Sequence, residues 1–328
     1  PSVFKKIAEG ELEKQKNKLF KIFSFFNTFG VGETYPMYTA NTVSGVKMTG
    51  ADISFNPGLF YFAVSGIHNQ DAIQGTSFNR KMFAGSIGIG SKDKSHFHIN
   101  LLKSWDNENS IDMTDLPPEL SPKDNLVLGT DFALNFLQDQ LQFKAEINGS
   151  MLTRDKTAPD LVTEDFPEFL KNFIDPKISS QFDFMYEVSS KFKSNDFGTN
   201  AEISFKSVGP GYVSLGAPNI RQDIISIRFK LSQPFADKKV MTSIYYKQDN
   251  NNIAKLNSTT STSSGFGINI KMNFKDLPYL IIDYRPNSIS NDASADSLSF
   301  KNNSNVFIVT TGVNQNEKDY SNSTNVVV

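Results

Sequence analysis

The sequence has no cysteine, few histidines and no long apolar run, and each absence excludes a class of protein or site. Without cysteine, the chain forms no disulfide, no thiolate metal centre and no cysteine nucleophile. No stretch reaches 18 consecutive apolar residues, which excludes a transmembrane helix. Lysine plus arginine (33) nearly balance aspartate plus glutamate (35), so the chain has no excess of basic residues for nucleic acid. We therefore expect no nucleic-acid partner and no membrane-spanning helix.

The first 19 residues differ in composition from the rest of the chain. The stretch FKKIAEGELEKQKNKLFKIF, which begins at Phe4, is rich in lysine and glutamate with sparse apolar positions, and it predicts a solvated helix. From Phe20 onward the apolar residues recur at every second position. We therefore expect a helical extension over residues 1–19 and a β-domain over residues 20–328.

A period of two residues dominates the β-domain. In GFGINIKMNF, Phe266, Ile268 and Ile270 alternate with glycine, asparagine and lysine. Because successive side chains of a strand point to opposite faces, such segments predict strands with one apolar face and one polar face. The charged residues that we assign to the polar face are Lys144, Glu146, Asp183, Glu187, Lys191, Glu202, Lys206, Arg228 and Lys230.

The connections between the predicted strands alternate in length. Short turns are predicted at 56–58, 92–95, 138–140, 195–198, 236–239 and 275–278. Long loops are predicted at 32–43, 69–77, 106–123, 155–180, 209–221, 250–262 and 287–303. Strands of roughly ten to fourteen residues with short turns at one end and long loops at the other are typical of a transmembrane antiparallel β-barrel.

A soluble β-sandwich would also alternate, but the rhythm of connections favours an all-β, up-and-down barrel. A closed sheet pairs every backbone N–H and C=O inside a bilayer. Its apolar face then meets lipid, and its polar face, with the charged residues named above, lines a wet interior. We count about fifteen strands, the last one cut short, whereas bacterial single-chain barrels have an even number. We therefore expect the natural chain to continue beyond Val328, or another chain to supply a strand.

One long loop carries an apolar stripe of its own. In TEDFPEFLKNFIDP, Phe166, Phe169, Leu170 and Phe173 recur at helical spacing, and a proline follows at position 176 to end the helix. This rim helix would pack on its own barrel, fold into its mouth or bind a partner protein.

Two of the three histidines, His96 and His98, stand two residues apart in HFHIN. On a strand they share the polar face with Asn100, where they would either bind a metal together with neighbouring carboxylates or form an ordinary polar pair. The polar pair is the commoner arrangement, so we expect no metal and no cofactor. His68, beside a long loop, has no serine or acid at a spacing that predicts a hydrolase, so we expect no enzyme.

Several stretches together resemble a family of outer-membrane β-barrel proteins common in the Bacteroidetes lineage, most of them known only as hypothetical proteins. These are FNTFGVGETYPMYTANTVSGVKMTGADISFNPGLFYFAVSG, SHFHINLLKSWDNENS, NLVLGTDFALNF, INGSMLTRD and VGPGYVSLGAPNIRQD, within residues 25–250. The resemblance implies an outer-membrane barrel with a periplasmic N-terminal extension and carries over no catalytic residue. The ending NSTNVVV departs from the family pattern, because it lacks the usual terminal aromatic residue.

Together these features predict a barrel in the outer membrane of a Gram-negative cell, with a periplasmic N-terminus. The leading hypothesis is a porin-like channel or uptake barrel for small solutes. The alternative is a structural or assembly subunit of a membrane protein complex, whose loops and N-terminal helix bind other outer-membrane or periplasmic proteins.

Overall fold

A computed structural model of the chain describes residues 23–327, apart from 115, 118, 163–167, 276, 294–297 and 317–320. The side chains of residue 169 and of residues beyond 313 are also outside the description. The helical extension expected over residues 1–19 therefore lies outside the described residues.

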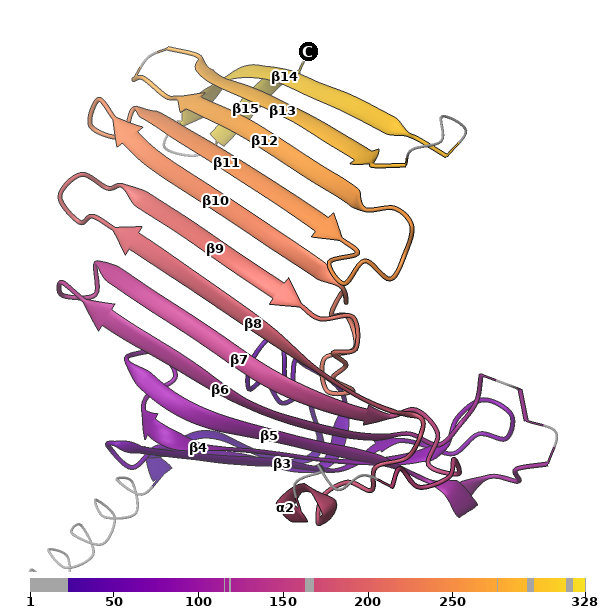
Figure 1. The fold of residues 1–328 in the computed structure, drawn as a ribbon. Coiled ribbons are helices and arrows are strands. Elements are labelled where there is room, and N and C mark those ends of the chain that lie inside the picture. The colour runs from indigo at the N-terminus through magenta and orange to yellow at the C-terminus, as the bar shows by residue number, and fades with distance from the viewer. Residues whose placement is uncertain are drawn as a thin grey trace, which may run out of the picture. The chain divides into compact units, whose positions relative to one another are not determined.

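The described residues form one antiparallel sheet of 15 strands, in which the order of the strands follows the order of the chain (Figure 1). The first eight strands are β1 (Phe26–Thr34), β2 (Met48–Phe55), β3 (Phe60–Gln70), β4 (Asn79–Gly90), β5 (His96–Asn107), β6 (Asp124–Phe136), β7 (Leu141–Thr153) and β8 (Ser180–Lys193). The others are β9 (Asn200–Val208), β10 (Ile224–Phe235), β11 (Val240–Asn251), β12 (Ser261–Met272), β13 (Tyr279–Asn291), β14 (Lys301–Asn316) and β15 (Ser321–Val327). This confirms the expected all-β, up-and-down antiparallel fold.

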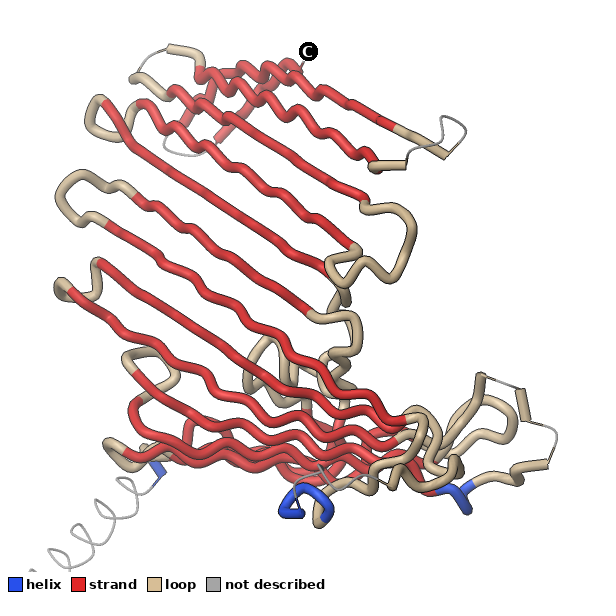
Figure 2. Tube along the Cα trace, viewed as in Figure 1, coloured by secondary structure: helices blue, strands red, loops and turns tan. Residues whose placement is uncertain are grey.

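The connections alternate between short turns and longer loops, as expected (Figure 2). The turn between β6 and β7 covers only 137–140, whereas the next connection covers 154–179. Leu137, Gln138 and Asp139 all have positive φ in that turn, which reverses the chain within a few residues. The short turns therefore lie at one end of the strands, and the longer loops lie at the other end.

Helices are few and short in the described part of the chain. A 3₁₀ turn, η1 (Glu108–Ser110), follows β5, and a single helical turn, α2 (Glu168–Lys171), lies in the loop after β7. The described residues include no helix with the length and apolar character needed to cross a bilayer.

The chain divides into two compact units. Unit 1 contains the chain up to Phe132, Asn148–Phe182 and Val213–Ile220, and unit 2 contains Ala133–Ile147, Asp183–Tyr212 and Arg221–Val328. In the sheet order, β1 and β15 are the two end strands, and no pairing between them is found among the described residues. Closure of the sheet into a barrel therefore stays a prediction.

Candidate functional site

Strand β5 buries its polar side chains and exposes its apolar ones. His98 and Asn100 are 2% and 1% exposed, whereas Phe97 and Ile99 between them are 42% and 41% exposed. A sheet face turned to water is normally the polar one. The alternation predicted from the sequence is present, and the apolar face is the uncovered one.

The strands that precede β5 follow the same rule. On β3, Phe60 and Phe62 are exposed while Tyr61 is buried, and on β4 Ile87 is exposed while Ser86 is buried. Ser86 is opposite Asn100 and Ile87 is opposite Ile99 in the register of β4 and β5, so like residues gather on the same face. Unit 1 thus has an apolar face that is exposed and a polar face that is covered.

Two loop segments cover the polar face of unit 1. The first is 35–47, in which the Tyr38 hydroxyl lies 2.8 Å from Ser65 Oγ and 3.2 Å from the Ala84 carbonyl oxygen. The second is 213–220, in which Ser214 Oγ donates to the Thr42 carbonyl oxygen at 2.6 Å. We call these the covering segments.

Asn125 on β6 holds the second covering segment against the strands. Its side-chain amide donates to the Val213 carbonyl oxygen at 3.0 Å and accepts from the Leu215 N–H at 2.9 Å. Ser150 on β7 also donates to the Val213 carbonyl oxygen. Polar side chains of two strands therefore pair with loop backbone, which offsets the cost of burying them.

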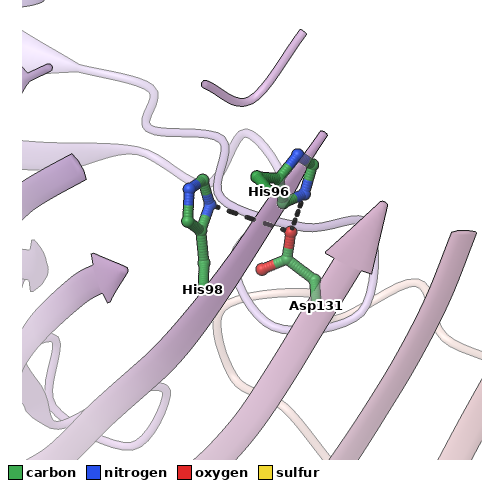
Figure 3. Close-up of side chains that lie close together, drawn as sticks. All are labelled: His96, His98 and Asp131. Atoms are coloured by element: carbon green, nitrogen blue, oxygen red, sulfur yellow. Dashed lines mark hydrogen bonds and ion pairs between the residues drawn. The ribbon is translucent and has the colours of Figure 1, made fainter. Parts of the chain in front are cut away.

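A cluster of two histidines and one aspartate lies on this polar face (Figure 3). His96 Nε2 lies 2.7 Å from Asp131 Oδ2, and His98 Nδ1 lies 3.9 Å from the same oxygen. Asn100 Nδ2 donates to the other carboxylate oxygen, Oδ1, at 2.5 Å. The aspartate comes from β6, the neighbour of β5 in the sheet order, so two adjacent strands supply all four side chains.

The contacts of His96 indicate what each of its ring nitrogens carries. Its Nδ1 lies 2.9 Å from the Lys94 carbonyl oxygen, which can only accept, so Nδ1 carries a hydrogen. Its Nε2 faces a carboxylate oxygen of Asp131, which also only accepts when ionised. The second contact is favourable only if a proton or a metal ion lies on Nε2. The cluster therefore has a place for one cation between His96 and Asp131.

Aromatic stacking and a glycine position the ring of His98. It stacks on Tyr61 with centroids 4.3 Å apart and on His96 with centroids 4.4 Å apart. Gly88 is opposite His98 in the register, and a Cβ there would lie 2.6 Å from His98 Cδ2 and 2.1 Å from the Phe97 carbonyl oxygen. Glycine at this position is thus required for the close approach of strand and ring. The buried Nε2 of His98 has no hydrogen-bond partner among the described residues.

The third histidine lies in different surroundings. His68 Nε2 is 2.9 Å from Asp71 Oδ1, and the Asp71 side chain is 87% exposed. This pair has no second histidine among its described contacts.

The charged residues assigned to the polar face in unit 2 lie opposite one another across neighbouring strands. Glu187 on β8 is opposite Lys206 on β9, with Oε2 and Nζ 3.4 Å apart. Glu202 is opposite Lys191 on one side and Lys230 on the other, so an acid lies between two bases. Residues opposite each other in a register share a face, so the structure brings these five together.

The other charged residues of the prediction have varied surroundings. Arg228 lies 3.5 Å from Asp249 of β11, and Asp183 Oδ2 accepts from the Gly211 N–H at 2.7 Å. On β7, Lys144 is exposed and Glu146 is half-buried. Unlike the polar face of unit 1, the strands of unit 2 have charged side chains in contact with solvent.

The predicted rim helix is shorter in the described residues than its apolar spacing implied. Phe166 lies outside them, and Phe169 is in α2 with its side chain not described. Leu170 packs on a cluster formed by Leu126, Met151 and Ile174, while Phe173 is 46% exposed. Of the three alternatives, packing on its own strands is found for Leu170.

A pocket lies beside this loop, lined by Lys103, Trp105, Asp124, Lys156, Phe173 and Ile174 among others. Lys103 pairs with Asp124, and Lys156 Nζ lies 2.8 Å from Glu108 Oε1. Three of its charged side chains are therefore paired within the protein, and we assign no ligand to the pocket.

Sequence reasoning missed Asp131, Asn125 and the covering segments. Asp131 interrupts a largely apolar stretch of β6. A carboxylate in apolar surroundings can mark a functional site. The pairing of Asp131 with His96 and His98 was not predictable, because the loop 108–123 does not fix the register of β5 on β6. The covering segments contain Gly, Pro and Thr typical of turns, which indicate a loop but not where it packs.

The comparisons with known proteins give no family. No protein-family model matches the chain, and no curated protein matches it. The resemblance to outer-membrane proteins of the Bacteroidetes lineage therefore stays a prediction, and the geometry described above is the basis for assigning a function.

Proposed function

We propose that the chain is an outer-membrane β-barrel whose apolar face meets lipid and whose polar face surrounds the interior. The observation that carries this proposal is the burial pattern of β5, where histidine and asparagine are buried and phenylalanine and isoleucine are exposed. In water this arrangement would expose apolar area at a cost of about 25 cal/mol per Å². In a bilayer the same side chains face hydrocarbon, and the cost is absent.

Closure of the sheet follows from the same environment. The end strands β1 and β15 each have one described neighbour, β2 and β14. An unpaired strand edge in lipid would leave N–H and C=O groups without partners, at several kcal/mol for each group. In the barrel that we propose, these edges pair with each other directly or through a further strand.

Within the barrel, we propose a passive channel for small solutes along the polar face of unit 2. The side chains of Glu202, Arg228 and Lys230 on that face are exposed, and charges of both signs alternate across the strands. A wall of mixed charge supports an aqueous path with weak ion selectivity.

A second candidate function rests on the covering segments. They fill the polar face of unit 1 with hydrogen-bonded backbone, which is typical of a rigid scaffold rather than of a water-filled wall. In that case the barrel is an anchor, and its long loops bind other outer-membrane or periplasmic proteins.

Conductance of the purified chain in a planar lipid bilayer separates the two candidates. A channel gives discrete conductance steps. The double variant Arg228→Glu/Lys230→Glu shifts its selectivity toward cations, because charges lining a pore set the selectivity. The control is Lys238→Glu with Lys239→Glu, which makes the same change of charge in the exposed turn after β10. Stable insertion without conductance would favour the scaffold, and equal shifts in both double variants would place the solute path elsewhere.

A further inference from the structure

The cluster on the polar face of unit 1 has the composition and spacing of a metal site. One nitrogen of His96, one of His98 and one oxygen of Asp131 all lie within 4.8 Å of one another. His98 is 2% exposed and the Asp131 side chain 16% exposed, so the three donors converge in a covered place (Figure 3).

We propose that His96, His98 and Asp131 bind one divalent transition-metal ion, with Zn²⁺ as the reference ion. Two imidazoles and one carboxylate are a ligand set that suits zinc and its neighbours in the first row. This proposal departs from our sequence-based expectation of an ordinary polar pair, because it uses Asp131, which the sequence did not connect with the histidines.

Metal binding requires only small changes in the distances between the ligand atoms. Ligand atoms about 2.1 Å from a tetrahedral zinc ion lie about 3.4 Å apart. The separation of His98 Nδ1 and Asp131 Oδ2, at 3.9 Å, is a few tenths of an ångström wider. The separation of His96 Nε2 and the same oxygen, at 2.7 Å, opens when an ion replaces the hydrogen bond. Each of these distances changes by less than about 1 Å.

Neighbouring groups hold the three ligands in orientation by hydrogen bonds and stacking. The Lys94 carbonyl oxygen holds the hydrogen of His96 on Nδ1 and leaves Nε2 to face the ion. Asn100 donates to Asp131 Oδ1 and directs the other oxygen toward the histidines. Tyr61 on one face of the His98 ring restricts its rotation.

The state of His98 gives a second, independent indication. A buried imidazole normally has hydrogen bonds at its nitrogens. Here Nε2 has no partner among the described residues, and the contact from Nδ1 to Asp131 is 3.9 Å, longer than a hydrogen bond. A metal ion between Nδ1 and Asp131 replaces this long contact with two coordination bonds.

Three protein ligands leave at least one coordination position for water or an exogenous ligand. The proposal therefore assigns a site with an available position on the polar face, and not a closed structural centre. Hard cations such as Ca²⁺ and Mg²⁺ prefer six or more oxygen ligands and are not expected to compete.

The test is metal binding by the full chain, refolded in detergent and freed of metal with a chelator. Titration with Co²⁺ is expected to give one saturable site per chain, with visible absorption bands of a four- or five-coordinate ion, and Zn²⁺ should displace it. Asp131→Asn, which is nearly isosteric, and His98→Ala should each weaken binding more than 100-fold. Asn100→Ala, which removes only the hydrogen-bond donor to Asp131 Oδ1, should weaken it by about 10- to 100-fold.

His68→Ala is the matched control, because His68 also contacts an aspartate but has no second histidine beside it. It should bind Co²⁺ like the unaltered chain. The proposal is overturned if the folded chain shows no saturable binding, or if Asp131→Asn and His98→Ala bind as tightly as His68→Ala. Heat-modifiable gel migration identifies variants that have folded. Binding is measured in detergent, so its failure is distinguishable from failure of the channel proposal, which is measured by conductance.

Discussion

Ile99 offers a direct test of the environment of the apolar face. It is 41% exposed on β5 and lies opposite Ile87, which is 55% exposed, on β4. In water, Ile99→Arg at such a position would change the free energy of unfolding by no more than about 0.5 kcal/mol. In a bilayer the guanidinium must enter hydrocarbon, at about 2–4 kcal/mol near the midplane. The two environments therefore predict different costs.

The position of Ile99 along its strand narrows this range. It is three residues from the start of β5 at His96. At about 3.3 Å per residue and a tilt of about 40°, it lies roughly 8 Å inside an apolar band about 25 Å tall. This is about two thirds of the way to the midplane, so we expect a cost of about 2–3 kcal/mol. That corresponds to roughly a 30- to 140-fold change in the unfolding equilibrium.

The assay is reversible denaturant unfolding in phospholipid vesicles, followed by fluorescence. Trp105 on β5 is the only tryptophan of the chain and reports the folded state of this strand. Val162→Arg is the control, because Val162 is 95% exposed in the connection between β7 and β8 and should tolerate the charge. If Ile99→Arg costs no more than Val162→Arg, the apolar face of unit 1 does not meet lipid and the barrel proposal is wrong.

Two further predictions concern topology and the covering segments. With a periplasmic N-terminus, single cysteines in the long loops should react with a membrane-impermeant maleimide on intact cells, and those in the short turns only after the outer membrane is opened; equal labelling of both sets would contradict this orientation. The positions on the long-loop side are Asn109, Glu168 and the last residues of β11 and β13, Asn251 and Asn291; the turn positions are Asp93, Asp139 and Asp237. Tyr38→Phe removes the buried hydroxyl that bonds Ser65 and the Ala84 carbonyl, and it should lower the free energy of unfolding by about 1–2 kcal/mol. The same vesicle assay measures that loss, whereas Tyr35→Phe should cost less, because Tyr35 is 57% exposed.

The sequence predicts the strands and turns well because both depend on local patterns. The alternation of HFHIN gives the two faces of β5, and short polar stretches such as that at 236–239 mark the turns. These features need only neighbouring residues, so a period of two and the turn residues were enough.

The candidate site was only half predictable, because its parts are far apart in the sequence. His96 and Asp131 are separated by 35 positions, and the loop between β5 and β6 does not determine their register. Thr42 and Ser214 are separated by 172 positions, which no local pattern connects. The sequence therefore indicated polar side chains on one face, but not which of them meet.

The contact between Thr42 and Ser214 also bears on the order in which the chain folds. Besides the chain up to Phe132 and Asn148–Phe182, unit 1 contains a segment, Val213–Ile220, that is synthesised later than both. Until that segment arrives, Asn125 and Ser150 lack the backbone partners that they have in the finished structure. Contacts of such long range make folding slow. We infer that an N-terminal fragment ending before Val213 would keep a hydrated, loosely packed polar face, so unit 1 becomes complete only when the chain has extended well into unit 2.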